Sequence, residues 1–302
     1  MMQATARPGA VAMIVLALSA CVIGLAPVLV RLADVGPAAA GFWRFALALP
    51  LLLVLTWRRA PEDGQAGPGL PGRWMVVAGL FFVADLAFWH YSIRMTSVVN
   101  ATVLCNLTPV VVTLFAWVMF RERPGASFMA ALALAILGAC MMAFGAQGAG
   151  EPGQLAGDLL ALSVALWYGG YFLAVKAARR HAGAMRVMFW ATAIGAPPLL
   201  LIGALLGEAL IPLTLAGWLV AAGLGLMHVV GQGGVAWALG RLPAAAVSMV
   251  VLVQPVVAAA LSWWLFAEAM TVLQGAGAVL VLAAVVMAQR APVRRLAGEG
   301  PA

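Results

Sequence analysis

Residues 109–122 read PVVVTLFAWVMFRE, and residues 255–268 read PVVAAALSWWLFAE. The two stretches align without a gap and share an opening Pro-Val-Val, a tryptophan, a phenylalanine and a closing glutamate. Other segments of the first half recur in the same order in the second: Leu16–Ser19 as Leu160–Ser163, Phe42-Trp43 as Phe189-Trp190, and Ala78–Leu80 as Ala222–Leu224. Single matches between apolar segments arise by chance, but an ordered set indicates a duplication. The sequence therefore predicts two related halves.

The composition indicates a membrane protein. Of the 302 residues, 65% are hydrophobic and 9% are charged, whereas about a quarter of the residues of a soluble domain are charged. So few charged residues cannot cover a soluble protein of this length, and a soluble enzyme is excluded. The net charge of +7 comes from basic residues scattered between apolar runs, so no nucleic-acid partner is expected. The three cysteines have no CxxC spacing and are interpreted as packing residues.

Ten apolar runs are long enough to cross a bilayer as helices. They lie near residues 11–32, 37–57, 74–95, 97–120, 126–145, 156–176, 185–207, 217–239, 243–266 and 271–289. We therefore predict an all-α integral membrane protein of ten transmembrane helices, with a first repeat over 11–145, a second over 156–289 and a cytoplasmic tail over 290–302. Because five is odd, the second repeat starts from the opposite side of the membrane. Such inverted repeats are typical of transporters that work by alternating access.

The distribution of basic residues predicts the orientation. With ten spans, fourteen of the seventeen Lys and Arg residues fall on the side of the two termini, and the exceptions are Arg31, Arg44 and Arg94. The positive-inside rule then places both termini in the cytoplasm of a bacterial-type inner membrane. Arg44 and Arg94 are expected near the outer interface, where they reach water at little cost or neutralise a substrate carboxylate.

The two Pro-to-Glu stretches, together with Trp43-Arg44-Phe45 in the second predicted helix, resemble the EamA family of the drug/metabolite transporter superfamily. The resemblance covers nearly the whole chain and extends in length and helix count to amino acid exporters of the YddG type. It implies a ten-helix basket whose central cavity is lined mainly by the third, fourth, eighth and ninth helices. It also implies export of small metabolites, amino acids or drugs. Fused repeats and a one-sided charge bias favour a monomer over the small relatives that dimerise in dual topology.

The third predicted helix carries an acid far from either membrane interface. Asp85 is a candidate to bind a substrate ammonium group or to carry a coupling proton, and the alternative is a structural pair with an arginine or a backbone group of a neighbouring helix. Trp89 shares the helical face of Asp85, whereas His90 points about 140° away. His90 is a candidate titrating switch or an interfacial hydrogen-bonding residue.

The other candidate residues of the central cavity lie at helical spacing. Thr102, Asn106, Pro109 and Thr113 form one face of the fourth helix, and Gln254 precedes the repeat-related Pro255. His228 and Gln232 share a face of the eighth helix, as Trp167 and Tyr171 do in the sixth. Each set has an alternative role in helix packing. Pro109 and Pro255 are candidate hinges, or static kinks, because a proline inside a helix frees a carbonyl group.

These features predict a secondary transporter that exports small metabolites such as amino acids by alternating access, with protons as a candidate coupling ion. The alternatives are a multidrug or cation efflux carrier of the same fold and, less favoured, an integral membrane enzyme. No HExxH, acid cluster or phosphate-binding loop is present, so no enzyme activity, metal or cofactor is expected. Glu122 and Glu268 are expected at the membrane surface, closing helix ends or pairing with loop arginines.

Overall fold

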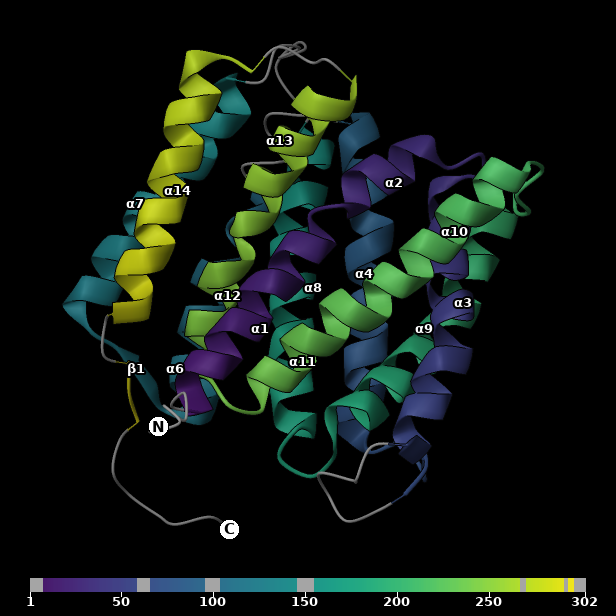
Figure 1. The fold of residues 1–302 in the computed structure, drawn as a ribbon, viewed down its shortest axis with the longest axis horizontal. Coiled ribbons are helices and arrows are strands. Elements are labelled where there is room, and N and C mark those ends of the chain that lie inside the picture. The colour runs from purple at the N-terminus through teal and green to yellow at the C-terminus, as the bar shows by residue number, and fades with distance from the viewer. Residues whose placement is uncertain are drawn as a thin grey trace, which may run out of the picture.

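The computed structural model describes residues 8–58, 66–95, 104–145, 155–266, 270–290 and 293–295. This part of the chain is almost entirely helical (Figure 1). The helices of the first half are α1 (Pro8–Ile23), α2 (Ala26–Leu32), α3 (Pro37–Arg58), α4 (Arg73–Met95), α6 (Thr108–Phe120) and α7 (Ala126–Gly145). Those of the second half are α8 (Leu155–Ala178), α9 (Ala184–Leu205), α10 (Leu215–Met227), the π-helical turn η1 (His228–Gln232), α11 (Gly233–Leu239), α12 (Ala244–Val251), α13 (Val253–Phe266) and α14 (Val272–Arg290).

The predicted all-α membrane architecture is confirmed in its helical content and in the presence of several long apolar segments. Seven segments of the described chain are long and apolar enough to cross a bilayer: Gly9–Leu32, Pro37–Trp57, Leu155–Ala178, Ala184–Leu205, Leu215–Leu239, Ala244–Leu265 and Val272–Arg290. Thr108–Phe120 and Ala126–Met142 are shorter apolar helices. Together with α4, these two occupy the remaining three predicted spans, and the count of ten stays a prediction.

Two of the predicted spans are interrupted at equivalent positions of the two halves. The described part of the span predicted over 97–120 contains a turn at Asn106 and Leu107, after which α6 begins. The span predicted over 243–266 is interrupted at Leu252, between α12 and α13. The proline that follows each break has no N–H group and collides with the carbonyl four residues earlier. The Thr108 hydroxyl donates a 2.8 Å hydrogen bond to the carbonyl of Cys105, the residue four before Pro109.

The two halves interleave. α4 packs against α8 and α9, α3 against α9 and α10, and α7 against α14, so most helix pairs combine one element from each half. Figure 1 shows α7 and α14 side by side at one edge of the molecule, with α3, α9 and α10 toward the opposite edge. A two-stranded antiparallel ribbon of β1 (Glu122–Pro124) and β2 (Val293–Arg295) joins the end of α6 to the segment after α14. This packing surrounds α4, α8 and η1 with other helices and creates the interior of the bundle.

Candidate functional site

The π-helical turn η1 places two polar side chains in the interior. His228 and Gln232 are both buried, although they lie in the middle of a long apolar segment. A π-turn inserts a residue into a helix and is frequent at functional sites. Close packing accompanies it, because a Cβ atom on Gly231 would lie 2.5 Å from the Ile23 Cγ1 atom of α1. Gly231 therefore lies both in a local break of the helix and in a tight contact with α1.

His228 connects two other helices through its ring nitrogens. The Nε atom of Arg44 in α3 lies 3.3 Å from His228 Nδ1, and the Oγ1 atom of Thr192 in α9 lies 2.9 Å from His228 Nε2. A guanidinium group only donates, so Nδ1 accepts its hydrogen bond and Nε2 carries the ring proton. The geometry therefore assigns a neutral His228 that donates to Thr192.

Aromatic rings enclose this chain of hydrogen bonds. The Phe82 ring of α4 stacks on Tyr171 with centroids 4.4 Å apart and on His228 with centroids 5.7 Å apart. The Arg44 guanidinium carbon lies 5.4 Å from the centroid of the Phe82 ring, within the range of a cation–π contact. Phe45 contacts both rings, with its centroid 4.9 Å from that of His228 and 5.2 Å from that of Phe82. The rings hold the Arg44 side chain and exclude lipid from it.

Asp85 and Tyr168 lie next to Arg44. Asp85 of α4 is buried, and its carboxylate interacts electrostatically with the Arg44 guanidinium. Arg44 is therefore a charged neighbour of Asp85, and a direct pair between the two side chains stays a prediction. Tyr168 of α8 is close to both Asp85 and Arg44, and its hydroxyl faces the amide groups of Gln232 and Gln254. Side chains from α3, α4, α8, α9, η1 and α13 thus form one polar cluster, which we call the central cluster: Arg44, Asp85, Tyr168, Tyr171, Thr192, His228, Gln232 and Gln254.

The structure brings together some of the predicted site residues. The Tyr171 hydroxyl lies 3.4 Å from Gln232 Oε1, and His228, Asp85 and Gln254 complete the predicted members of the central cluster. Trp167 contacts Phe81 and Phe88 of α4, at centroid distances of 5.9 and 5.7 Å.

The remaining predicted site residues lie elsewhere in the chain or outside the described part. Trp89 is half-buried in α4, and Asn106 lies in the turn before α6. Thr102 and the side chain of His90 lie outside the described residues. Pro109 and Pro255 lie in the first turns of α6 and α13.

The expected position of Arg44 at the outer interface is wrong. The side chain is buried, and seven residues of α3 precede it from Pro37 onward. At 1.5 Å per residue this places Arg44 about 10 Å inside the helix end, beyond the depth of an interfacial residue. Sequence reasoning also left Tyr168 aside and missed Thr192, whose one signal is a hydroxyl in an otherwise apolar run.

Several polar atoms in the interior have no partner among the residues that the structure describes. The buried side-chain atoms without a hydrogen bond include Arg44 Nη2, Gln254 Nε2, Trp167 Nε1 and Thr113 Oγ1. Buried polar groups in proteins are nearly always paired with protein or water. The central cluster therefore has hydrogen-bonding capacity that its own residues leave unused. Within the same part of the chain, no group of three or more His, Cys, Asp and Glu side chains is placed to hold a metal ion.

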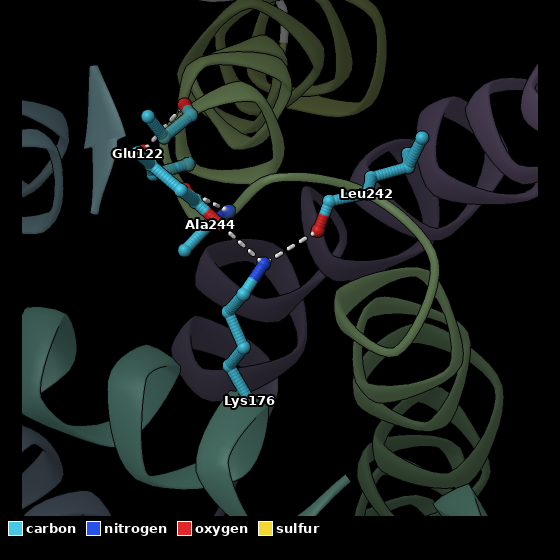
Figure 2. Close-up of polar contacts among 6 residues, drawn as sticks. Glu122, Lys176, Leu242 and Ala244 are labelled. Atoms are coloured by element: carbon cyan, nitrogen blue, oxygen red, sulfur yellow. Dashed lines mark hydrogen bonds and ion pairs between the residues drawn. The ribbon is translucent and has the colours of Figure 1, made fainter. Parts of the chain in front are cut away.

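A second polar cluster lies at the end of α6 (Figure 2). Lys176 of α8 lies 2.7 Å from Glu122 Oε1 and donates a 2.8 Å hydrogen bond to the Leu242 carbonyl. Glu122 Oε2 accepts a 2.9 Å hydrogen bond from the backbone N–H of Ala244, the first residue of α12. The expectation that Glu122 closes a helix end is thus met. The alternative of a loop-arginine partner is wrong, because Glu122 is 1% exposed and pairs with Lys176 of α8, and its position at the membrane surface stays a prediction. Glu268 lies outside the described residues.

Two acids connect the repeats at the end of the bundle where α3 and α10 begin. Asp34 Oδ2 accepts hydrogen bonds from the backbone N–H groups of Leu213 and Thr214 and from the Thr214 hydroxyl. These bonds, chiefly that from the Thr214 hydroxyl, hold the pKa of Asp34 below its ordinary value. Glu208 Oε2 accepts a 3.0 Å hydrogen bond from the backbone N–H of Ala39, in the first turn of α3. The two repeats are therefore joined by carboxylates at both ends of the bundle.

Comparison with known proteins gives one family and one fold. The model of a family described as the EamA-like transporter family matches residues 10–144 and again residues 155–289. No curated protein sequence matches the chain. A solved structure described only as the crystal structure of a protein is 18% identical, covers 90% of this chain and 94% of its own, and superposes with a TM-score of 0.75. At that identity the likeness concerns the fold alone.

Proposed function

The chain belongs to the EamA-like transporter family, and from this premise we propose that it is a secondary carrier that exports small metabolites such as amino acids by alternating access. The resemblance inferred from the two Pro-to-Glu stretches is confirmed by the family match over both halves. The identity of the substrate, the direction of transport and the alternating-access mechanism are parts of our proposal.

The pair of equivalent helix breaks carries the proposal. The turn at Asn106 and Leu107 precedes α6 in the first repeat, and the break at Leu252 separates α12 from α13 at the equivalent place in the second. Transporters with inverted repeats use discontinuous helices near the membrane midplane to form a substrate site and to move around it. We therefore assign Pro109 and Pro255 as hinges, about which α6 and α13 rotate relative to the segments before them.

The central cluster is the proposed substrate site. It lies among α3, α4, α8, α9, η1 and α13, and it contains the buried ionisable side chains of Arg44 and Asp85. Ionisable residues inside a membrane protein are costly and are by default functional hypotheses. In this proposal Asp85 binds a substrate ammonium group or carries the coupling proton, while Tyr171, His228, Gln232 and Gln254 form polar walls. Trp89, Trp167 and Asn106 are proposed to extend the site, as are His90 and Thr102.

A cation or drug efflux carrier is the second candidate. It is favoured by the aromatic rings beside Asp85, since Phe82, Tyr168 and Tyr171 offer faces that attract cations. Both candidates share the site and the mechanism, and they differ in the charge of the substrate.

For either candidate function we propose that the protein is a monomer in a bacterial-type inner membrane with both termini in the cytoplasm.

Counterflow in proteoliposomes tests the carrier proposal. Vesicles containing the purified chain are loaded with one unlabelled amino acid at high concentration and diluted into the same labelled compound, and the panel is repeated with quaternary amines. Transient accumulation of label above that in protein-free vesicles supports a carrier, and the compounds that give it separate the two candidates. Chemical conversion of the label without exchange would contradict both.

A further inference from the structure

Arg44 carries a charge that the protein leaves only partly compensated. Its side chain is 6% exposed. Its Nε atom donates to a neutral His228, and its Nη2 atom has no partner in the described part of the chain. Asp85 acts on it electrostatically. A buried guanidinium group with a free donor is costly unless another acceptor completes it.

The unused hydrogen-bonding groups of the central cluster, and those of Trp167 and Thr113, are all able to donate. Arg44 Nη2 and Gln254 Nε2 are N–H donors, and Tyr168 lies beside both residues. Trp167 Nε1, one residue before Tyr168 in α8, is a third unused N–H donor, and Thr113 Oγ1 is a hydroxyl. No carbonyl or carboxylate oxygen of the described central cluster is a buried atom without a partner. The missing ligand group is therefore an acceptor.

We propose that Arg44 is the anion-binding residue of the transport site and that the substrates carry a carboxylate group, an inference that rests on the proposed carrier function. A guanidinium group matches the two oxygens of a carboxylate better than any other side chain. Phe82, whose ring lies beside the Arg44 guanidinium, provides an apolar surface for the rest of the substrate. Asp85 lies near the position proposed for the anion, so its carboxylate can bind an ammonium group on the same substrate. Cations that lack an acceptor place a second positive charge beside Arg44 and are disfavoured.

A series of matched ligands tests the proposal on the unaltered protein. Phenylacetate, phenylacetamide and 2-phenylethylamine present the same ring with a carboxylate, a neutral amide or an ammonium group, and L-phenylalanine presents both charges. Binding is measured by isothermal titration with the full chain in nanodiscs. We expect phenylacetate and L-phenylalanine to bind at least ~10-fold more tightly than the amide and the amine, as is usual for a buried charge pair. Affinities that do not depend on the carboxylate group overturn the proposal. The absence of binding by both phenylacetate and L-phenylalanine overturns it as well.

Substitution of Arg44 assigns the effect to this residue. Arg44→Gln is expected to bring the affinity for phenylacetate to that for phenylacetamide, and Arg44→Lys to restore part of the difference, because the charge returns without the planar fork. The matched control is Arg186→Gln, since Arg186 uses its Nε donor on the Pro68 carbonyl, away from the central cluster. Unchanged carboxylate binding in a folded Arg44→Gln protein overturns the proposal.

The same proteins distinguish this inference from the carrier proposal. Carboxylate binding that depends on Arg44, without counterflow of any carboxylate, supports the site and contradicts transport. Counterflow that is equally fast for carboxylates and for amines supports transport and overturns the role of Arg44.

Discussion

The Nζ atom of Lys176 lies 2.7 Å from the Oε1 atom of Glu122, and the two residues belong to different repeats (Figure 2). Both side chains are almost fully buried. Glu122 also accepts a hydrogen bond from the first N–H of α12, so a single carboxylate joins the ends of α6 and α8 to the start of α12. α6 begins directly after the turn at Asn106 and Leu107, and α12 ends directly before the break at Leu252. Movement of either about its break must separate these groups.

Replacement of Glu122 by glutamine is predicted to destabilise the protein by about 3 kcal/mol or more, because it leaves the Lys176 ammonium group buried without its carboxylate. The measurement is the free energy of unfolding in mixed micelles. Glu208→Gln is the control, since Glu208 also accepts a helix-start N–H but makes no ion pair in the described structure. It is expected to cost about 1 kcal/mol. Equal losses from the two variants would show that the ion pair contributes nothing. A double variant that adds Lys176→Met is predicted to recover part of the loss.

Replacement of Asp85 by asparagine is predicted to slow transport of zwitterionic substrates while folding is preserved. The change removes a buried charge beside Arg44 and keeps the shape of the side chain. The rate of counterflow is compared with that of the unaltered protein over a range of external pH. If Asp85 binds an ammonium group or a proton, the variant loses rate and its pH dependence changes. Identical rates and binding at every pH would refute either role.

Replacement of Thr192 by valine is predicted to destabilise the protein by about 1–3 kcal/mol, since the His228 Nε2–H group loses its acceptor inside the bundle. The variant is also predicted to weaken ligand binding, because His228 in turn orients Arg44. Thr56→Val in α3 is a matched control. The Thr56 hydroxyl donates to the Leu53 carbonyl of its own helix, so its loss is expected to leave binding unchanged. The two readouts are thermal unfolding and titration with phenylacetate.

Part of the site could be predicted from spacing alone. His228 and Gln232 are four residues apart, so they share a helical face, and the structure places both in the interior. Pro109 and Pro255 likewise predicted where the two helical segments are interrupted. A proline within a helix acts through the backbone, and its effect depends little on the neighbouring helices.

The partners of these residues could not be predicted in the same way. Arg44 and His228 are 184 positions apart, and Glu122 and Ala244 are 122 apart. Both pairs arise because α3 packs on α9 and α10, and α6 on α12. A sequence pattern reports the face of one helix and gives no information about which helix covers it. The charge count for topology also treated Lys176 as an orientation signal, and its burial against Glu122 was not visible from that count.

Asp34 is predicted to make stability dependent on pH in the acid range. Its pKa in the folded protein lies below the ordinary value of about 3.9, chiefly because of the Thr214 hydroxyl. A lowered pKa means that the carboxylate stabilises the fold fully above the ordinary value, and that this contribution is lost as the pH falls through the lower, folded pKa. Asp34→Asn is therefore predicted to unfold at a lower temperature than the unaltered protein at neutral pH. The difference should vanish in strong acid, and a difference that is constant with pH would contradict the assignment.

Two glycines determine how closely α7 and α14 approach. A Cβ atom on Gly277 would lie 2.6 Å from the Gly138 carbonyl oxygen and 2.8 Å from the Met142 nitrogen, and one on Gly138 would lie 2.8 Å from the Gly277 carbonyl oxygen. These are backbone atoms, so the helices must separate to admit a methyl group. Gly277→Ala is predicted to destabilise the protein by about 1–3 kcal/mol, as overpacking does in other cores.

The control for this prediction is in the same helix. Gly275 has no atom within 4 Å of its missing Cβ position. Gly275→Ala is therefore expected to stabilise α14 by about 0.5–1 kcal/mol, since alanine loses less backbone freedom than glycine on folding. The two variants make the same chemical change two residues apart, and opposite signs in the free energy of unfolding would assign the loss at Gly277 to the contact with α7. Stabilisation by both substitutions would mean that α7 and α14 can separate at no cost, and the close approach of the two glycines would then have no role in holding the edge of the bundle together.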